Sequence, residues 1–578
     1  MFLNDALGRQ QRIKYICNHH EQACTMAAEG YSRVTGKIGV AVVTTGPGGL
    51  NAINGVFGAW TDSIPMLIVS GQVKKATSLC CNDQPELRQL GDQEADIITI
   101  VKSITKYSIV VKEPDSIRYH LEKALFLAMS GRPGPCWLDI PIDVQSAQIN
   151  PENLLGYDPA ENEKPVNTQL IAEQCAETIK KIREASRPVV MVGTGIRLAG
   201  ALEVFSRVIN KMQIPVTTAW TAHDSIDSND PLYCGRPGTI GDRPGNFTVQ
   251  NSDCLLVIGC RLNIRQVSYN WDSFADQAYK IQVDIDPQEL NKPTVRPDMG
   301  ICCDAKLFLE EVDRQLGGDC GNHSEWLGWC RERLKRYPVV EQRHRVNKND
   351  MINPYDFADT LFNQLNEDDV VVCGNGSACV VPFQSAKIKK GLRLFCNSGC
   401  ASMGYDLPAA IGAAFGRGGK RVICLAGDGS IQMNIQELQT MVHHQLPIKL
   451  FVLNNNGYLS IKLTQESFFK GCMVGSGPES GVSFPDMCRL GQAYGIPSSR
   501  VNYGNFAVKI SEVLKTHGPV LADVMLDPTQ GFEPKLSSRT LQDGSIVSAR
   551  LEDLSPFLDR EEMSNNILFT KSVENSKR

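Results

Sequence analysis

Residues 421–458 read RVICLAGDGSIQMNIQELQTMVHHQLPIKLFVLNNNGY, and this stretch decides the fold. The apolar, β-prone run at 422–425 predicts a strand that a Gly-Asp-Gly turn ends sharply. Helical periodicity over 434–443 and a second apolar run at 448–453, which follows a proline, predict a helix and another strand. The stretch is therefore a βαβ unit, the building block of a parallel sheet.

Polar residues directly follow both predicted strands of this unit. Asp428 and Asn455 should lie close together, because open parallel sheets bind ligands at the carboxyl ends of their strands. Both offer oxygen atoms, the ligands that Mg²⁺ prefers. Gly427 and Gly429 allow the backbone to approach a phosphate closely. The unit predicts a site for Mg²⁺ and a diphosphate.

A Gly-Asp-Gly followed one βαβ unit later by paired asparagines resembles the diphosphate-binding motif of thiamine diphosphate (thiamine pyrophosphate) enzymes. Within them, GDGSIQMNIQEL at 427–438 and NSGCASMGYDLPAAIGAA at 397–414 resemble the large catalytic subunit of acetolactate synthase. The resemblance covers nearly the whole chain. A Gly-Asp-Gly alone would carry little weight, because such tripeptides are common in surface turns.

Composition narrows the class of protein. A length of 578 residues suggests roughly three domains. The net charge of −5 gives no reason to expect nucleic acid or an anionic membrane as a partner, and no apolar run approaches a membrane span of ~18 residues. None of the 20 cysteines has C-x-x-C spacing, and several lie in or beside apolar strands. They are expected to be reduced, buried thiols of a cytoplasmic protein.

The chain divides into three segments of alternating strands and helices, which predicts an α/β protein with three Rossmann-like parallel-sheet domains. The resemblance makes 1–148 the domain that binds the pyrimidine of the cofactor, shortened by its first strand-helix unit. It makes 165–335 a central domain and 353–530 the domain for the diphosphate and Mg²⁺. The tail, 531–578, is a candidate lid over the active site and ends in an expected disordered segment, 572–578.

The resemblance also assigns a catalytic acid. In that family a Glu at the start of a helix protonates the aminopyrimidine ring of the cofactor, and Glu21 occupies this position within NHHEQACTMAAEGYSR. Alone, Glu21 would more simply cap and match the dipole of a helix N-terminus. His20 is expected to line the same pocket.

A glycine-rich segment, TTGPGGLNAINGVFGAWTDSIPMLIVSGQ at 44–72, follows an expected strand. Its Gly-Pro-Gly-Gly makes a tight turn before a helix, which is either a structural loop or a place of close approach to a ligand. The resemblance places Gly48 and Asn51 at the active site. It carries Gln72 over as a side chain close to the reactive carbon of the cofactor.

On the third domain the resemblance implies two sets of residues. Asp428 and Asn455 would bind Mg²⁺ through their side chains and Gly457 through its carbonyl. The cofactor would contact Gly376, Ser377, Ala378, Met403, Gly427, Gly429 and Ser430. The chain departs from the family at Ser377-Ala378, where acetolactate synthases usually have Gln-His.

The central segment resembles the FAD domain of acetolactate synthases. The words VGTGIRLAG at 192–200 and GCRLNIRQ at 259–266 stand at its flavin contacts, and Arg265 is the candidate flavin residue. The glycine spacing in the first word does not fit the dinucleotide fingerprint. FAD therefore remains an open alternative at this stage.

The implied reaction is decarboxylation of a 2-keto acid, pyruvate, with transfer of the two-carbon unit to a carbonyl acceptor. Ser460 and Thr464 replace a Met and a Trp of the family, which opens the channel and keeps a nucleotide-linked keto sugar of surface polysaccharide synthesis as an alternative acceptor. A catalytically inactive paralogue with a regulatory or scaffold role is the alternative from another class.

An acid on the first domain and a metal site on the third are expected to meet across a subunit boundary. The resemblance therefore implies a homodimer or a homotetramer. It leaves open whether a regulatory subunit is needed.

Overall fold

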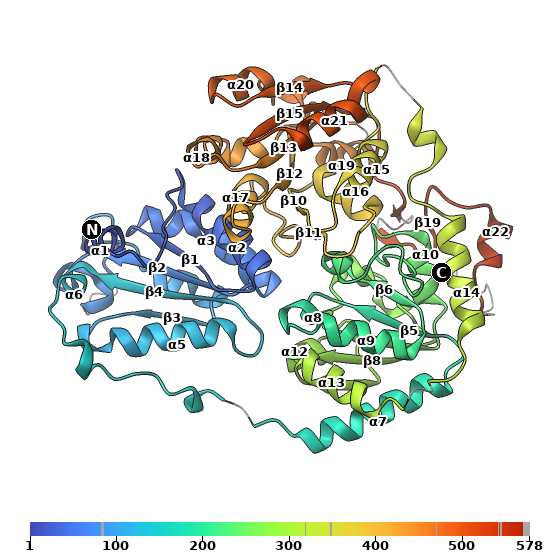
Figure 1. Cartoon of the computed structure of the whole chain (residues 1–578), viewed down its shortest axis with the longest axis horizontal. Coiled ribbons are helices and arrows are strands. Elements are labelled where there is room, and N and C mark those ends of the chain that lie inside the picture. The colour runs from blue at the N-terminus through green and yellow to red at the C-terminus, as the bar shows by residue number, and fades with distance from the viewer. Residues whose placement is uncertain are drawn as a thin grey trace.

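The computed structural model describes residues 1–82, 86–163, 165–317, 320–346, 350–469, 471–540, 543 and 546–569. Within these residues, three parallel sheets with flanking helices follow one another along the chain, as Figure 1 shows. The predicted α/β class with three parallel-sheet domains is confirmed. The expectation for 572–578 lies outside the described residues.

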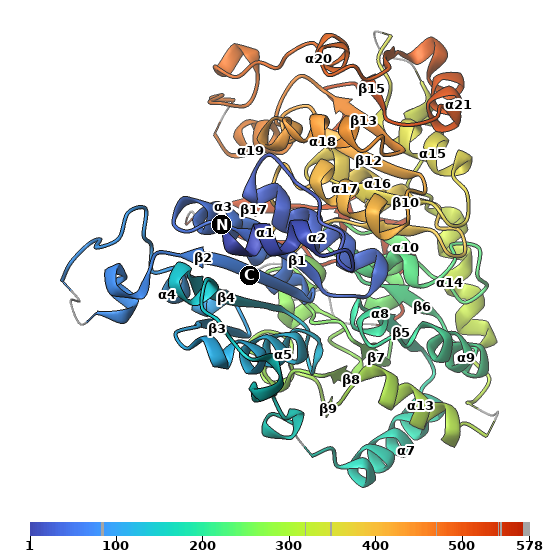
Figure 2. The same ribbon diagram turned by 60° about the vertical axis from the view of Figure 1, so that its left-hand side comes forward.

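The first sheet is four-stranded, in the order β1-β2-β4-β3. Its strands are β1 (Gly39–Val43), β2 (Met66–Gln72), β3 (Tyr107–Val110) and β4 (Pro135–Pro141). Its helices are α1 (Phe2–Arg9), α2 (Glu21–Thr35), α3 (Pro47–Asp62), α4 (Ile97–Val101), α5 (Ile117–Met129) and α6 (Ile142–Gln145). The described residues between β2 and α4 project from the carboxyl end of the sheet (Figure 2).

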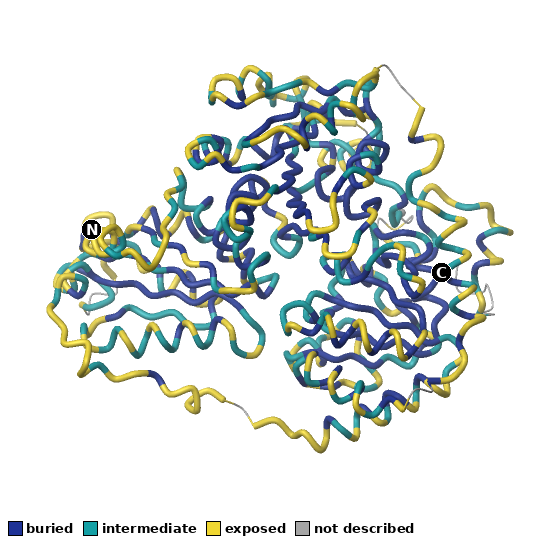
Figure 3. Tube along the Cα trace, in the orientation of Figure 1, coloured by how far each residue is buried: buried dark blue, intermediate teal, exposed yellow. Residues whose placement is uncertain are grey.

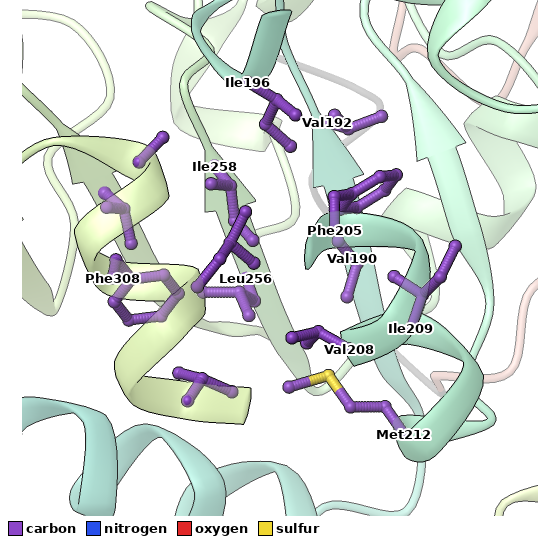
Figure 4. Close-up of a cluster of buried hydrophobic side chains, with 14 of the residues drawn as sticks. Val190, Val192, Ile196, Phe205, Val208, Ile209, Met212, Leu256, Ile258 and Phe308 are labelled. Atoms are coloured by element: carbon purple, nitrogen blue, oxygen red, sulfur yellow. The ribbon is translucent and has the colours of Figure 1, made fainter. Parts of the chain in front are cut away.

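The central sheet is five-stranded, in the order β6-β5-β7-β8-β9. Its strands are β5 (Pro188–Val192), β6 (Val216–Thr218), β7 (Cys254–Ile258), β8 (Tyr279–Asp284) and β9 (Met299–Cys302). Its helices are α7 (Thr168–Glu184), α8 (Gly195–Leu198), α9 (Leu202–Met212), α10 (Arg243–Gln250), α11 (Ile264–Val267), α12 (Pro287–Leu290), α13 (Ala305–Gln315) and α14 (Ser324–Arg336). Apolar side chains of β5, β7, α9 and α13 interdigitate in one core, shown in Figure 4.

The third sheet is six-stranded, in the order β11-β10-β12-β13-β15-β14. Its strands are β10 (Val370–Cys373), β11 (Arg393–Phe395), β12 (Val422–Gly427), β13 (Ile448–Asn454), β14 (Ser498–Val501) and β15 (Val520–Met525). Its helices are α15 (Pro354–Gln364), α16 (Ser377–Ser385), α17 (Asp406–Gly416), α18 (Glu437–His443), α19 (Leu459–Phe468), α20 (Met487–Ala493) and α21 (Phe506–Lys515). β12 and β13 pair in parallel, as the βαβ interpretation predicts.

The helix expected at 434–443 begins later than predicted. A 3-10 turn, Ile431–Asn434, precedes α18, which starts at Glu437. The Asn434 side chain donates a hydrogen bond to the Gly404 carbonyl (2.8 Å) and so ties the turn to a neighbouring loop. This tertiary contact competes with the local helical pattern.

The first and third domains meet where α2 packs along α17. A Cβ on Gly30 would lie 2.2 Å from the Ala409 carbonyl oxygen, and one on Gly412 would lie 1.8 Å from that of Ala27. Only glycine leaves room for backbones this close, because a Cβ atom essentially never approaches within 3.0 Å of another heavy atom. The two glycines thus set the distance between the helices.

The central domain is joined to the others by ion pairs that are buried or half-buried. Asp224 binds both Arg197 and Arg393, and Arg393 also donates to the backbone carbonyl of Arg33 on α2 (2.9 Å). Although burial opposes it, the two guanidinium groups hold the pKa of Asp224 below its usual value. Arg132 of the first domain pairs with two carboxylates near α12, at 2.9 Å each.

The tail runs back over the central domain. It contains the short pairs β16 (Lys535–Leu536) with β19 (Leu554–Ser555) and β17 (Ser538–Thr540) with β18 (Ile546–Ser548), followed by α22 (Arg560–Asn565). The start of the candidate lid is hydrogen-bonded to the third domain and to the central domain. The Pro534 carbonyl accepts from Gln384 (2.6 Å), and Leu536 N–H donates to the Thr239 carbonyl (2.7 Å).

The buried residues gather in and around the sheets, whereas the linker between α6 and α7 is mostly exposed (Figure 3). Cys254, Cys260, Cys373 and Cys424 are buried as predicted, and all 20 cysteines are free thiols, but the expectation of burial is wrong for Cys17, Cys302 and Cys472, which are exposed. In the described part of the chain we find no helix with the length and apolar character needed to cross a membrane.

The α2–α17 contact yields a stability prediction. Gly412→Ala forces a methyl group onto a backbone oxygen, and overpacking of this kind costs about 1–3 kcal/mol. The Tm should fall by several degrees. Gly328→Ala is the matched control, because Gly328 also lies inside a helix but faces open space, where alanine gains ~1 kcal/mol of helix propensity. An unchanged Tm for Gly412→Ala would contradict the tight packing.

A second prediction concerns Glu29 of α2, whose side chain is fully buried beside Arg33. Burial raises the pKa of Glu29 from 4.5 to about 7, although Arg33 opposes the rise. The folded protein holds this proton more tightly than the unfolded chain. The group therefore removes stability as the pH rises from about 4.5 to about 7, and no more above that.

Glutamine at position 29 cannot ionise. Between about pH 5 and about pH 8, the difference in Tm between Glu29→Gln and the wild type should shift in favour of the variant. Glu325→Gln, at an exposed position, serves as the control. A difference that stays constant over this range would show that Glu29 does not titrate in it.

Candidate active site

The carboxyl ends of β10, β12 and β13 lie side by side and build the first half of the site. β10 leads into Gly376 and α16, β12 into Asp428, and β13 into Asn455. The strands deliver these groups to one edge because they are parallel neighbours in the sheet.

Asp428 is a buried carboxylate held by backbone groups. It is 2% exposed, and its oxygens accept from the N–H groups of Gly429 (2.8 Å) and Gly457 (3.1 Å). Burial raises its pKa to about 6, and the two N–H groups oppose the rise. Such a group is stabilised in its charged form by a nearby cation.

Asn455 supplies a second oxygen beside it. Its Nδ2 donates to the Ser377 hydroxyl (3.3 Å), whereas its Oδ1 is buried and has no hydrogen-bond partner among the described residues. An unpaired buried amide oxygen is costly. A carboxylate and an orphan amide oxygen at one sheet edge fit the oxygen ligands of Mg²⁺.

Two glycines of this edge admit no side chain. A Cβ on Gly429 would lie 2.2 Å from the Tyr458 ring, and one on Gly457 would lie 2.5 Å from the Ser476 carbonyl oxygen. Gly376 has φ +64°, and Ala378 behind it is fully buried. The backbone is therefore bare where a phosphate would approach.

Ser430 and Met403 are positioned by a residue that sequence reasoning missed. The Ser430 hydroxyl donates to Asp406 (2.7 Å) and accepts from Gly404 N–H (2.9 Å), so it fixes the loop that carries Met403. Asp406 is fully buried, which raises its pKa to about 6. Met403 itself is 37% exposed, although these hydrogen bonds hold the loop that carries it.

The second half of the site lies on the first domain. Glu21 is the first residue of α2, and Asn51 of α3 donates to its carboxylate (3.1 Å). A Cβ on Gly48 would come within 3.4 Å of the other Glu21 oxygen. The structure thus brings together three of the predicted residues from two helix N-termini.

His20 caps the helix that Glu21 opens. Its Nδ1 accepts from Gln22 N–H (3.1 Å), and its own N–H and that of His19 donate to the Glu437 carboxylate (3.2 and 2.9 Å). Glu437 is fully buried on α18 of the third domain. Sequence reasoning missed it, because a carboxylate in the first turn of a helix carries no sign of a distant partner.

Gln72, predicted to face the cofactor, has its amide fully engaged. Nε2 donates to Asp139 (2.9 Å) and to the Ala95 carbonyl (3.2 Å), and Oε1 accepts from the Thr45 hydroxyl (2.8 Å) and Val73 N–H (2.9 Å). A glutamine amide offers two donors and two lone pairs. All four are in use.

Among the described residues, no hydrogen bond or ion pair joins Glu21 to Asp428 or Asn455. The α3 face beside Asn51 exposes Leu50 and Phe57, at 44% and 40%.

A separate cavity of about 290 Å³ lies at the carboxyl ends of β5, β7 and β8. Both glycine-rich words contribute to it. Its lining includes Thr194, Gly259, Arg261, Asp284, Arg132 and Gly399, which come from all three domains. A Cβ on Gly193 would lie 2.1 Å from the Gly259 carbonyl oxygen, so the two turns pack backbone to backbone.

The predicted flavin residue is not part of this lining. Arg265 is exposed, with its guanidinium 5.9 Å from the centre of the Trp220 ring. Arg261, which sequence reasoning passed over, does line the cavity, and its guanidinium has no ion pair or hydrogen bond within the described ranges.

Comparisons with protein families define the class. Three family models match: the N-terminal TPP binding domain of thiamine pyrophosphate enzymes at residues 1–97, their central domain at 175–312, and their C-terminal TPP binding domain at 374–524. The chain is thus a thiamine pyrophosphate enzyme, with TPP binding domains at its N-terminal and C-terminal matches.

Individual relatives narrow this class. Acetolactate synthase 1, chloroplastic, of Zea mays is 31% identical over 552 residues, 93% of this chain and 83% of that protein. Acetolactate synthase large subunit of Cyanidium caldarium is 30% identical over 540 residues, 92% and 88% of the two chains. A probable acetolactate synthase large subunit of Methanococcus aeolicus is 31% identical over 550 residues, 91% and 88%. The chain belongs to the acetolactate synthase large-subunit family.

Proposed function

We propose that this protein decarboxylates pyruvate with thiamine diphosphate and Mg²⁺ and transfers the two-carbon unit to a carbonyl acceptor, as acetolactate synthases do. The observation that carries the proposal is the orphan Asn455 oxygen beside the buried Asp428, at the sheet edge that the family's C-terminal domain provides. Nothing in the geometry favours the keto-sugar acceptor or an inactive paralogue.

In this proposal each half of the site has its own task. Asp428, Asn455 and the Gly457 carbonyl would hold Mg²⁺, and Gly376, Ser377, Gly427 and Gly429 would cradle the diphosphate. When bound, the cofactor would accept the electron pair that the broken C–C bond leaves behind as CO₂ departs. Glu21 would hold a proton at the carboxylate oxygen that Asn51 leaves free, with His20 capping its helix.

CO₂ release from pyruvate tests the reaction directly. Purified protein with thiamine diphosphate and Mg²⁺ should release CO₂, and Glu21→Gln should slow the release by about 10²–10⁴-fold, the usual contribution of a positioned acid. Folded, cofactor-loaded wild type that releases none would overturn the proposal. Product analysis with a second keto acid identifies the acceptor.

We also propose that the active unit is at least a homodimer, with Glu21 of one subunit facing Asp428 of the other. The support is that no hydrogen bond or ion pair among the described residues joins Glu21 to Asp428 within one chain, and that Leu50 and Phe57 beside Asn51 are exposed.

Mixing two inactive variants checks this arrangement. Glu21→Gln and Asp428→Asn, unfolded and refolded together, form mixed dimers in which one of the two sites has both native residues. About a quarter of the wild-type activity should return. Each variant refolded alone is the control. If the mixture stays as inactive as its components, the two residues act within one chain.

A flavin in the central cavity is a further part of the proposal. The support is the bare backbone of the two glycine turns and the unpaired Arg261 cation, which suits an anionic phosphate.

The free thiols fit a reducing compartment, and we propose the cytoplasm.

The visible absorption of the purified protein reports on the flavin. FAD should copurify with the wild type. Arg261→Ala should lower its occupancy roughly tenfold, the effect of losing one charge-assisted hydrogen bond. Arg265→Ala should leave it unchanged, because Arg265 does not line the cavity. The reverse order would restore Arg265 as the flavin residue, and a colourless wild type would exclude FAD.

A further inference from the structure

The carboxyl ends of β1, β2 and β4 carry a buried polar network that the proposed reaction does not use. Asp139, on β4, is 1% exposed, and both of its oxygens accept hydrogen bonds. Ser70 donates to one (2.5 Å) and Gln72 to the other (2.9 Å). Trp137 donates in turn to the Ser70 hydroxyl (2.8 Å), so the carboxylate rests on a rigid base.

This carboxylate decides which way the Gln72 amide faces. An acceptor at Asp139 requires Nε2 on that side, which turns Oε1 toward Thr45 and Val73. Were the amide reversed, its oxygen would face the carboxylate and its NH₂ would face Val73 N–H. Both contacts would be repulsive, so the acceptor oxygen of Asp139 selects one orientation.

The oriented amide joins two loops, one of which carries Gly48 beside Glu21. Thr45 immediately precedes the glycine turn that contains Gly48, and Ala95 belongs to the segment after β2. The loops also touch directly, because a Cβ on Gly46 would lie 1.8 Å from the Gln93 carbonyl oxygen. The backbone of Gln93 has φ 59°, a left-handed conformation that residues other than glycine rarely adopt unless the surrounding structure supports it.

Keeping an ionisable group here is costly. Burial raises the pKa of Asp139 to about 7, even though the Ser70 and Gln72 hydrogen bonds lower it. A neutral side chain would fill the space without this cost, which indicates that two acceptor oxygens are needed at this place.

We propose that Asp139 is a positioning residue of the active site, which fixes the Gln72 amide and through it the Thr45–Gly48 loop beside Glu21 and the 91–96 segment packed against that loop. Gln72 then acts by holding loops together rather than by offering a free group to the substrate. The catalytic part of this inference rests on the proposed function, and the loop-holding part does not.

Two substitutions separate an acceptor role from general packing. Asp139→Asn can keep an oxygen toward Gln72, because the Ser70 hydroxyl can turn and accept from the new NH₂ group. Asp139→Leu has the same size and no acceptor. Pyruvate kcat should fall roughly ten- to a hundredfold in Asp139→Leu, with KM within about threefold, and should stay within about threefold of the wild type in Asp139→Asn.

A double variant tests whether Asp139 acts through Gln72. Added to Gln72→Leu, Asp139→Leu should lower kcat less than about twofold further, because the shared link is already broken. Leu67→Ala is the stability control, since it empties a buried site on the opposite face of β2, in a core cluster that does not include Trp137. It should lower the Tm and keep kcat at temperatures below unfolding.

Hydrogen exchange of the full chain without cofactor gives a readout that needs no activity. Amides at 44–51 and 86–96 should exchange faster in Asp139→Leu and at the wild-type rate in Asp139→Asn. Thr45→Val, which removes one hydroxyl from the half-buried loop, should speed exchange at 44–51 even if Asp139→Leu does not fold.

Equal losses in the Asn and Leu variants, multiplying losses in the double variant, or unchanged exchange would each overturn the proposal. Wild type that releases no CO₂ but shows the predicted exchange pattern would overturn the proposed function and leave Asp139 as the residue that holds the loops.

Discussion

The contact between α2 and the helices of the third domain is the constraint on which the site depends. Gly30 and Gly412 let α2 and α17 approach until backbone meets backbone. At the start of α2, the buried Glu437 accepts hydrogen bonds from Asn18, His19 and His20. The helix α2 is therefore fixed both along its length and at its N-terminal end, where Glu21 is the first residue. α17 itself starts at Asp406, which orients Ser430, so one helix pair positions part of each half.

The fold could be predicted from sequence wherever the signal was local. Apolar runs at 422–425 and 448–453 became β12 and β13, and the polar residues after them lie at one sheet edge because parallel neighbours end together. The start of α18 was predicted too early, because the Asn434 side chain donates a hydrogen bond to the Gly404 carbonyl, which is distant in sequence. Local periodicity contains no information about such a partner.

In the candidate site, too, the residues that belong to local motifs were predicted, and those that act through distant contacts were missed. Glu21, Asn51 and Gly48 do lie together, as do Asp428, Asn455 and Gly457. The residues that sequence reasoning missed are those that contact these groups from distant segments. Glu437 looks like an ordinary first-turn carboxylate and Arg261 like an ordinary loop cation until the fold brings their neighbours to them.

These supporting residues share a physical pattern. Asp139 accepts from Gln72, Asp406 from Ser430, and Asp523 from Asn454 (2.9 Å), and all three carboxyl groups are almost fully buried. A neutral amide or hydroxyl can rotate between donor and acceptor, whereas a carboxylate only accepts. Placing one beneath each amide or hydroxyl fixes that group's direction before any ligand arrives. Because a buried charge without such a partner is strongly destabilising, the fold holds each pair together. The edges of the sheets are therefore preorganised by buried carboxyl groups that need not touch the ligand.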